Sequence, residues 1–181
     1  METALTTVIV GVAVVALVKM TLNATQQNRY SERLTRASIL AENVREMMAG
    51  MPFNDASTGT TTFGPETGEV LATYNDVDDF DGFDSTNRPD ITGGAAVGVV
   101  DANRQVITQV VNGTAQVPDE WIGWRQQIAV DPVDPNNLTL ALPKPNTTRT
   151  VVRVTVTISK RIPGTINYDQ ILQMQWLKAK L

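Results

Sequence analysis

An uncharged apolar run near the start constrains this chain more than any other feature. From Ala4 to Val18 the sequence has no charged residue and consists mainly of Val, Ala, Ile and Leu, while Glu2 stands directly before the run. A helix that is apolar all round must be surrounded by lipid or by other apolar helices. At about 1.5 Å per residue the run would span roughly 22 Å, somewhat less than a bilayer core requires.

The helix is predicted to continue well beyond this run. Residues 20–49 contain no glycine or proline, and Gly50 and Pro52 then supply a helix stop. The larger apolar residues of this second half recur on one face, at Leu22, Tyr30, Leu34, Ala37, Ala41, Val44 and Met48. We therefore predict one helix over residues 2–49, with a hydrophobic segment 1–19 and an amphipathic half 20–50.

Residues 51–181 are predicted to form a β-rich head, which makes the chain α+β. Alternation along "EWIGWRQQIAV" and "RTVVRVTVTISKR" predicts two strands, and "NLTLAL" a third. The residues expected on the buried face are Ile122, Trp124, Ile128 and Val130 in the first, and Val152, Val154, Val156 and Ile158 in the second. The amphipathic half of the helix is expected to pack on this antiparallel sheet.

The last hairpin needs a specific register to bury one face. A two-residue turn at Pro163-Gly164 would place Val154 opposite a glutamine. We instead predict a longer turn or a bulge near Ile162. The expected pairs are then Val154 with Leu172, Val152 with Met174 and Ile158 with Tyr168.

Composition excludes several classes of function. The chain has no cysteine and no histidine, which leaves carboxylates, Lys, Ser, Thr and Tyr as chemical groups. A hydrolase with paired aspartates is weighed and rejected, because the spacing of the aspartates is irregular. The net charge of −4 argues against a nucleic-acid partner. We expect no enzymatic activity and no required cofactor.

One acidic stretch of the head is a candidate metal site. Its five aspartates are Asp76, Asp78, Asp79, Asp81 and Asp84. Close carboxylates repel one another, and a calcium ion, which prefers oxygen ligands, would relieve that repulsion. The alternative interpretation is a solvated acidic loop that Phe80 and Phe83 hold against the sheet. Trp121, Trp124 and Trp176 are expected in the core or in a subunit contact rather than in a sugar-stacking platform.

The start of the chain resembles the type IV pilin and pseudopilin superfamily. The stretch "ETALTTVIVGVAVVALV" places an acidic residue before a Val/Ile/Ala/Leu run that contains a glycine, and a long amphipathic helix follows. The resemblance covers about the first fifty residues. It departs from the family in two ways: the glutamate stands second rather than fifth, and no helix-breaking proline follows the run. Either a few residues precede Glu2 in the natural precursor, or the terminus pairs differently.

The resemblance implies a filament subunit. A prepilin peptidase would cut the precursor from its leader in the inner membrane, where it has a single span. The pilus assembly machinery would then build it into a helical homopolymer at the cell surface. The assembly residues implied are Met1, Glu2, Thr3 and Gly11, with Glu2 neutralising the amino terminus of a neighbouring subunit. Major pilin, minor pilin and pseudopilin of a secretion system all stay open.

Two alternatives to a filament start from the same apolar run. A secretory signal peptide would have its basic residues before the run, whereas here Lys19 and Arg29 follow it. A simple anchor would hold an extracytoplasmic binding module at the membrane and would tolerate any apolar sequence. Glu2 and an amphipathic stripe that continues without a linker favour the filament.

Overall fold

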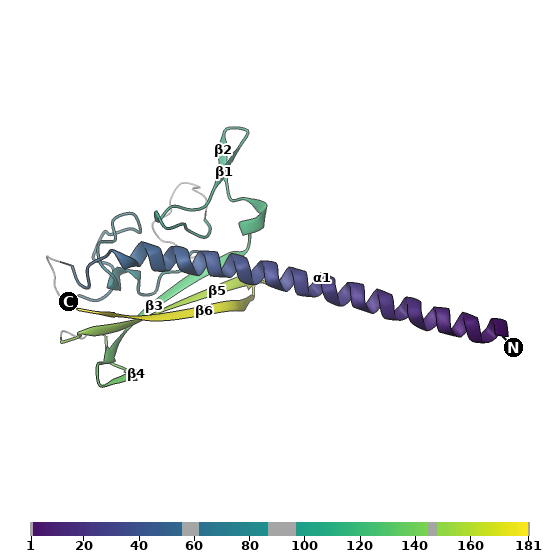
Figure 1. The fold of residues 1–181 in the computed structure, drawn as a ribbon. Helices are drawn as coiled ribbons and strands as arrows, with labels where there is room; N and C mark the ends of the chain where they lie inside the picture. Colours follow the sequence, from purple (N-terminus) through teal and green to yellow (C-terminus); the bar gives the residue numbers. More distant parts are fainter. Residues whose placement is uncertain (1, 56–61, 87–96, 145–147, 181) are drawn as a thin grey trace. The chain divides into compact units, whose positions relative to one another are not determined.

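The computed structural model describes the backbone of residues 2–55, 62–86, 97–144 and 148–180, and the side chains of these from residue 9 onwards. The chain divides into two compact units, Met1–Arg36 and Ala37–Leu181. One long helix, α1 (Glu2–Ala49), begins in the first unit and ends in the second (Figure 1). Its extent agrees with the predicted helix over residues 2–49.

The first unit consists of the N-terminal part of α1. Every side chain from residue 9 to residue 35 is exposed within the chain. Two threonine hydroxyls donate back to carbonyls one turn earlier, Thr21 to Leu17 at 3.0 Å and Thr25 to Thr21 at 2.9 Å. Burial of the predicted apolar stripe therefore begins only at Ala37, so that Leu22, Tyr30 and Leu34 are left uncovered.

The second unit packs the end of α1 on one face of an antiparallel sheet, as predicted. Ala37, Leu40, Ala41 and Val44 are fully buried there. Charged side chains of the same helical segment, such as Glu42 and Glu46, remain exposed on its opposite face. This division into an apolar and a charged face is what an amphipathic helix on a sheet requires.

The sheet has four strands in the order β4-β3-β5-β6, and each neighbouring pair is antiparallel. The strands are β3 (Trp124–Asp134), β4 (Asn137–Ala141), β5 (Val151–Arg161) and β6 (Tyr168–Ala179). In β5 the predicted alternation is confirmed: Val152, Val154, Val156 and Ile158 are buried and the residues between them are half-buried. A β-branched run of this kind suits a central strand that is covered on one face.

The expected inward position of Ile122 is wrong. Ile122 is 56% exposed and follows a short 3-10 helix, η2 (Asp119–Trp121), so it lies outside β3. Gly123 then turns the chain with a φ of 75°, a conformation that glycine adopts readily. From Trp124 the predicted alternation holds through Ile128 and Val130.

The predicted register of the last hairpin is also wrong. Val154 pairs with Trp176, Val152 with Lys178 and Ile158 with Leu172. Residues 162–167 form a longer loop, in which the Ile162 amide donates to the Asn167 carbonyl at 2.9 Å, and a bulge separates Ile158 from Ser159. The pairing is displaced by four residues. Because that number is even, the same residues of β6 still face the core.

Two smaller elements complete the second unit. Strands β1 (Gln109–Val111) and β2 (Thr114–Gln116) form a separate exposed hairpin. Its two-residue turn uses Asn112 and Gly113, both with positive φ, as a tight hairpin turn demands. A second 3-10 helix, η1 (Asp78–Phe80), lies within the acidic stretch.

Candidate functional site

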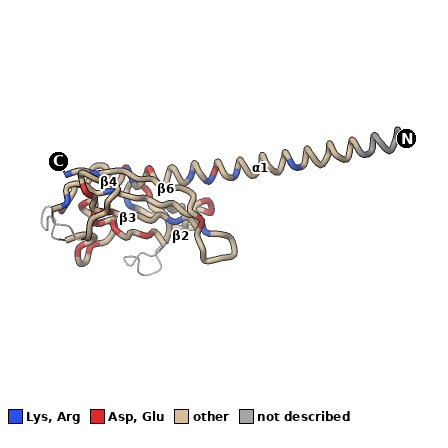
Figure 2. The backbone as a smooth tube through the Cα atoms, turned by 90° about the horizontal axis from the view of Figure 1, so that it is seen from below, with Lys and Arg blue, Asp and Glu red and all other residues tan. Residues whose placement is uncertain are grey.

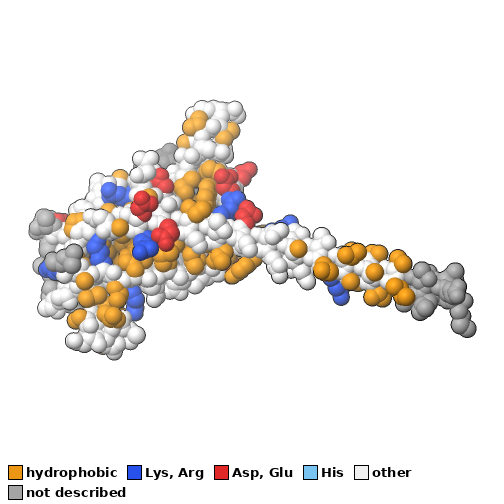
Figure 3. Space-filling model, in the orientation of Figure 1, with side chains coloured by type: hydrophobic (Ala, Val, Ile, Leu, Met, Phe, Trp, Pro, Cys, Tyr) orange, Lys and Arg blue, Asp and Glu red, His pale blue; other side chains and the backbone are white. Residues whose placement is uncertain are grey.

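The uncovered part of α1 carries a continuous run of exposed large apolar side chains. Ile9, Val14 and Met20 are 60%, 52% and 68% exposed. Lys19 is the charged residue between Glu2 and Arg29. Figure 3 shows apolar side chains along this segment, and Figure 2 shows charged residues gathered mainly in the second unit. Ordinary soluble monomers rarely leave so continuous an apolar surface uncovered.

The length and composition of α1 suit a membrane. Its described part, Ile9–Ala49, contains a window with a mean hydropathy of 1.5, none of which is buried in the chain. The helix is thus long and apolar enough to cross a bilayer. The same apolar surface is also suited to packing against other apolar helices.

The predicted assembly residues lie at the beginning of this segment. The side chains of Met1, Glu2 and Thr3 lie outside the described residues. Gly11 is helical, and a Cβ added to it would meet no atom within 4 Å. Since glycine in a helix interior costs about 0.5–1 kcal/mol relative to alanine, packing within this chain offers no reason for it.

The acidic stretch is folded into the second unit rather than solvated. Asp76, Asp78 and Asp79 are 2%, 3% and 1% exposed. Phe80 and Phe83 belong to the buried core, as the alternative interpretation expected, but the expectation that the aspartates themselves are solvated is wrong. They are buried because the aromatic side chains draw this short segment inward.

Backbone amides donate to one oxygen of each of two of these buried carboxylates. Oδ1 of Asp76 accepts from the amides of Asp78 and Asp79, at 2.9 and 3.2 Å. Oδ2 of Asp79 accepts from the amides of Asn75 and Asp76, at 2.8 and 3.1 Å. Burial, reinforced by the charge of Asp78, raises the pKa of Asp76 to about 7. Burial likewise raises the pKa of Asp79 to about 6, against the effect of the amide hydrogen bonds.

The remaining aspartates each have a cationic partner. Arg149 forms a buried ion pair with Asp78 at 2.9 Å and lies over the ring of Phe63. Lys144 contacts Asp81 at 2.8 Å, and Asp81 also accepts from the amide of Val130 at 2.9 Å. These pairs hold the acidic stretch against residues that come later in the sequence.

Asp84 lies apart from this group. Nε of Arg125 donates to both of its carboxylate oxygens at 3.0 Å. Burial by itself would raise the pKa of Asp84, but the hydrogen bonds from Arg125 and Thr86 outweigh that effect and hold the pKa below its ordinary value. The five predicted ligands are therefore not gathered around one point.

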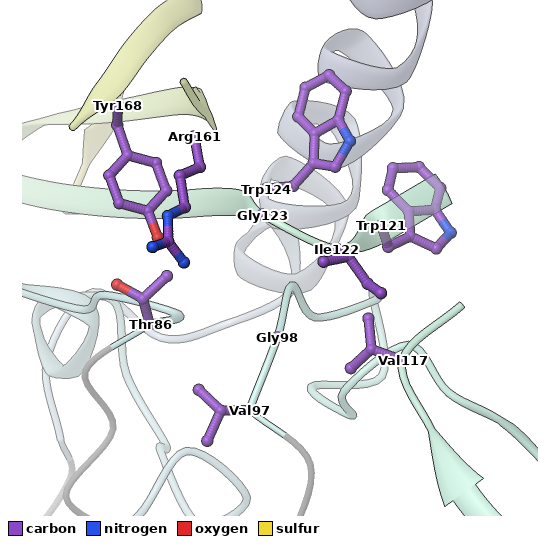
Figure 4. A pocket seen from close by; sticks show the side chains of 10 residues that line it. All are labelled: Thr86, Val97, Gly98, Val117, Trp121, Ile122, Gly123, Trp124, Arg161 and Tyr168. Atoms are coloured by element: carbon purple, nitrogen blue, oxygen red, sulfur yellow. The ribbon is translucent and has the colours of Figure 1, made fainter. Parts of the chain in front are cut away.

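A cavity of about 180 Å³ opens beside η2 and the ends of β5 and β6 (Figure 4). Figure 4 shows Tyr168 and Arg161 on one side of it and Trp121 on the other. It is smaller than ordinary ligand pockets of about 300–1,000 Å³. The residues that line it are Thr86, Val97, Gly98, Val117, Trp121, Ile122, Gly123, Trp124, Arg161 and Tyr168, and they include no nucleophile paired with a general base.

The three tryptophans lie as the sequence predicted, in or against the core. Trp124 is 3% exposed, and its indole nitrogen donates to the Glu120 carbonyl at 2.9 Å. Trp121 and Trp176 are partly buried and pack against the core. None of the three is arranged as an open sugar-stacking platform.

Gln126 is an important buried residue that the sequence analysis did not single out. It is fully buried in β3, and its side-chain Nε2 donates to the carbonyls of Leu40 and Val100 at 3.2 and 3.0 Å. Its Oε1 accepts from the Val100 amide at 2.6 Å. The signal was present, since Gln126 stands at an inward position between Trp124 and Ile128.

Comparison with protein-family models, with curated proteins and with solved structures found no match to this chain.

Proposed function

We propose that this chain is a structural, non-enzymatic subunit of a type IV pilus-like filament, and that it polymerises through the apolar part of α1. The observation that carries the proposal is the difference in side-chain burial between the two parts of this helix. Residues 9–35 are exposed, whereas Ala37, Leu40, Ala41 and Val44 are fully buried in the second unit. In water the exposed segment would need a lipid or protein environment.

Gly11 supports a protein environment over lipid alone. Small residues at a helix interface let neighbouring backbones approach closely. Among the described residues, no atom lies within 4 Å of the position that a Cβ of residue 11 would occupy. A bundle of α1 helices from successive subunits would use that space, while a lipid-embedded tether has no need of it.

Glu2 would serve this bundle as a register device. A carboxylate among apolar helices needs a partner, and the amino terminus of a neighbouring subunit is a suitable one. The subunit would wait in the inner membrane as a single-pass precursor, after a prepilin peptidase has processed it. The assembly machinery would then draw it into a cell-surface filament, either as the main component or as a minor pilin or pseudopilin.

The second candidate is a membrane-anchored extracytoplasmic binding module. It is favoured by the suitability of α1 for a bilayer and by the cavity beside η2. In that case the apolar segment is only a tether. Changes at Glu2 or Gly11 that preserve insertion would then have no further effect.

The test compares Glu2→Ala and Gly11→Leu with Glu46→Ala, which removes an exposed carboxylate from the covered part of the same helix. Filament yield is measured by electron microscopy and membrane content by immunoblotting. We expect both first-unit variants to keep the subunit in the membrane and to lose filaments. Glu2→Ala breaks a buried charge pair, which costs about 3–5 kcal/mol. Gly11→Leu fills the space that close approach of neighbouring helices requires. Normal filaments from both variants would refute the proposal, and a parent without filaments would favour the anchored module.

A further inference from the structure

The cavity beside η2 has a polar side and an apolar side. Arg161 is the one charged residue among the described residues that line it, and neither an aspartate nor a glutamate is among them. Tyr168 and Thr86, which carry hydroxyl groups, lie on the same side as Arg161 (Figure 4). Val117 and Ile122 lie on the other side. The cavity therefore offers a cation and hydroxyls to one end of a ligand and hydrocarbon to the other.

Close packing of the backbone shapes the wall of this cavity. Gly123 turns the chain after Ile122, and a Cβ added to Gly123 would lie 3.3 Å from Cβ of Arg161. The Arg161 amide donates to the Gly123 carbonyl at 2.7 Å. Gly98 is buried, and a Cβ added there would lie 3.0 Å from Cγ2 of Val117. The backbone thus fixes the positions from which Arg161 and Val117 reach the cavity.

The guanidinium of Arg161 is oriented, but its charge is not paired. Its Nε donates to the Thr165 carbonyl at 2.7 Å, within the loop between β5 and β6. Among the described residues, no carboxylate forms an ion pair with Arg161. Two other cations of this region are engaged, since Arg125 pairs with Asp84 and Nζ of Lys160 donates to a backbone carbonyl at 2.6 Å. Arg161 is thus the cation of this region that a ligand can use.

We propose that this cavity binds a small organic carboxylate, with its carboxylate at Arg161 and its apolar body against Val117 and Ile122. Since Nε of Arg161 is already engaged, the two terminal nitrogens remain, and a carboxylate accepts two parallel hydrogen bonds from such a pair. One guanidinium matches the single charge of a carboxylate better than the nearly double charge of a phosphate monoester. The hydroxyls of Tyr168 and Thr86 offer further polar contacts on the same side.

The size of the cavity restricts the ligand to a compact molecule. Its volume is about 180 Å³. An engineered apolar cavity of about 150 Å³ in another protein takes up benzene. A single ring or a short branched chain therefore fits, whereas larger ligands occupy pockets of about 300–1,000 Å³.

The site is independent of filament assembly, because every residue that lines it belongs to the second unit. It would supply the ligand of an anchored binding module, and it would equally equip a filament subunit to take up small acids. Failure of the filament proposal therefore leaves this one standing, and the reverse is also true.

The experiment uses the full chain in an uncharged detergent at neutral pH. Trp121 and Trp124 line the cavity, so tryptophan fluorescence reports when it is occupied. The probes are benzoate, its neutral isostere benzamide, and acetate, which has the charge without the apolar body. We expect benzoate to bind at one saturable site per chain, at least about tenfold more tightly than either of the others. No saturable binding of benzoate, or equal binding of benzoate and either other probe, would overturn the proposal.

Variants of the two sides of the cavity separate the roles of charge and apolar contact. Arg161→Gln should lower the affinity for benzoate to that for benzamide, and Arg161→Lys should restore part of it, because lysine keeps the charge without the planar fork. Ile122→Ala, at an exposed position, should weaken both ligands and leave their ratio unchanged. Arg45→Gln removes an exposed guanidinium from α1 and is the matched control, which should bind as the parent does.

Melting temperatures from near-ultraviolet circular dichroism establish that each variant is folded. The ratio of benzoate to benzamide affinity is the deciding measurement, because a purely structural role of Arg161 would weaken both ligands alike. A parental ratio in Arg161→Gln would overturn the assignment of the carboxylate to this residue.

Discussion

Val14 and Val44 lie on the same helix but in different surroundings. Val14 is 52% exposed, and Val44 is completely buried against the sheet. Around Val44 the helix has a charged face for water and an apolar face for the core, whereas around Val14 it is apolar on all sides. The comparison teaches that the second unit is complete within one chain, while the first unit needs an environment from outside.

Polar contacts distinguish the two parts as well. In the second unit, Gln126 bonds to the carbonyl of Leu40, and Nζ of Lys178 donates to the carbonyl of Met48 at 3.0 Å. In the first unit, the hydroxyls of Thr21, Thr25 and Thr35 donate to carbonyls one turn earlier in the same helix. Bonds of this local kind do not depend on what surrounds the helix.

The largest difference in stability is expected when the same substitution, valine to aspartate, is made in the covered and in the uncovered part of α1. Val44→Asp places a carboxylate in the core and should destabilise the second unit by more than about 4 kcal/mol. Val14→Asp should change its stability by less than about 0.5 kcal/mol. Thermal unfolding by near-ultraviolet circular dichroism measures this, because all three tryptophans lie in the second unit. Equal losses of stability in both variants would break the comparison.

A smaller effect is expected at the contact that ties the covered part of α1 to β3. Gln126→Leu leaves the carbonyls of Leu40 and Val100 without their side-chain donor and the Val100 amide without its acceptor. We expect the free energy of unfolding, measured in urea, to fall by about 2–4 kcal/mol. Gln175→Leu, at an exposed position of β6, is the matched control, and its free energy of unfolding should lie within about 0.5 kcal/mol of that of the parent. A Gln126 variant as stable as this control would show that apolar packing alone holds the helix.

The ion pair of Asp84 and Arg125 is predicted to make a pH-dependent contribution to the free energy of unfolding of the second unit. Because the folded pKa of Asp84 is lowered, its carboxylate stabilises the fold above its ordinary pKa of 3.8, and this stabilisation disappears as pH falls through the folded value. Asp84→Asn should cost about 1–2 kcal/mol at neutral pH and progressively less in acid. Urea unfolding over a range of pH, with Asp119→Asn as an exposed control, measures it. A difference that does not change with pH would contradict the assignment.

The smallest effect on stability is expected from the largest deletion. Removing residues 1–19 takes away only segments of α1 whose described side chains are exposed, so the melting temperature of the second unit should be unchanged. The shortened chain should also stay monomeric without detergent, as analytical ultracentrifugation would report. Aggregation with no cooperative melting would mean that the second unit needs the apolar segment to fold.

Local patterns were sufficient for the elements whose signals repeat every few residues. The helix over residues 2–49 followed from its continuous lack of glycine and proline and from the stop at Gly50. The faces of β5 followed from strict alternation between apolar and polar residues. The same alternation would have placed Gln126 inward, but an amide at that position is easily passed over because its partners are Leu40 and Val100, far away in the sequence.

What the sequence by itself determined is therefore the type and extent of the main elements and the existence of an apolar segment that lacks a partner. Only the tertiary structure decided the register of β6, the burial of Asp76 and the separation of Asp84 from the other aspartates. It also brought Arg161 and Ile122 to one cavity. The physical reason is that periodicity reports which face of an element is apolar, whereas register, ion pairing and the lining of a cavity depend on loops that bring distant residues together.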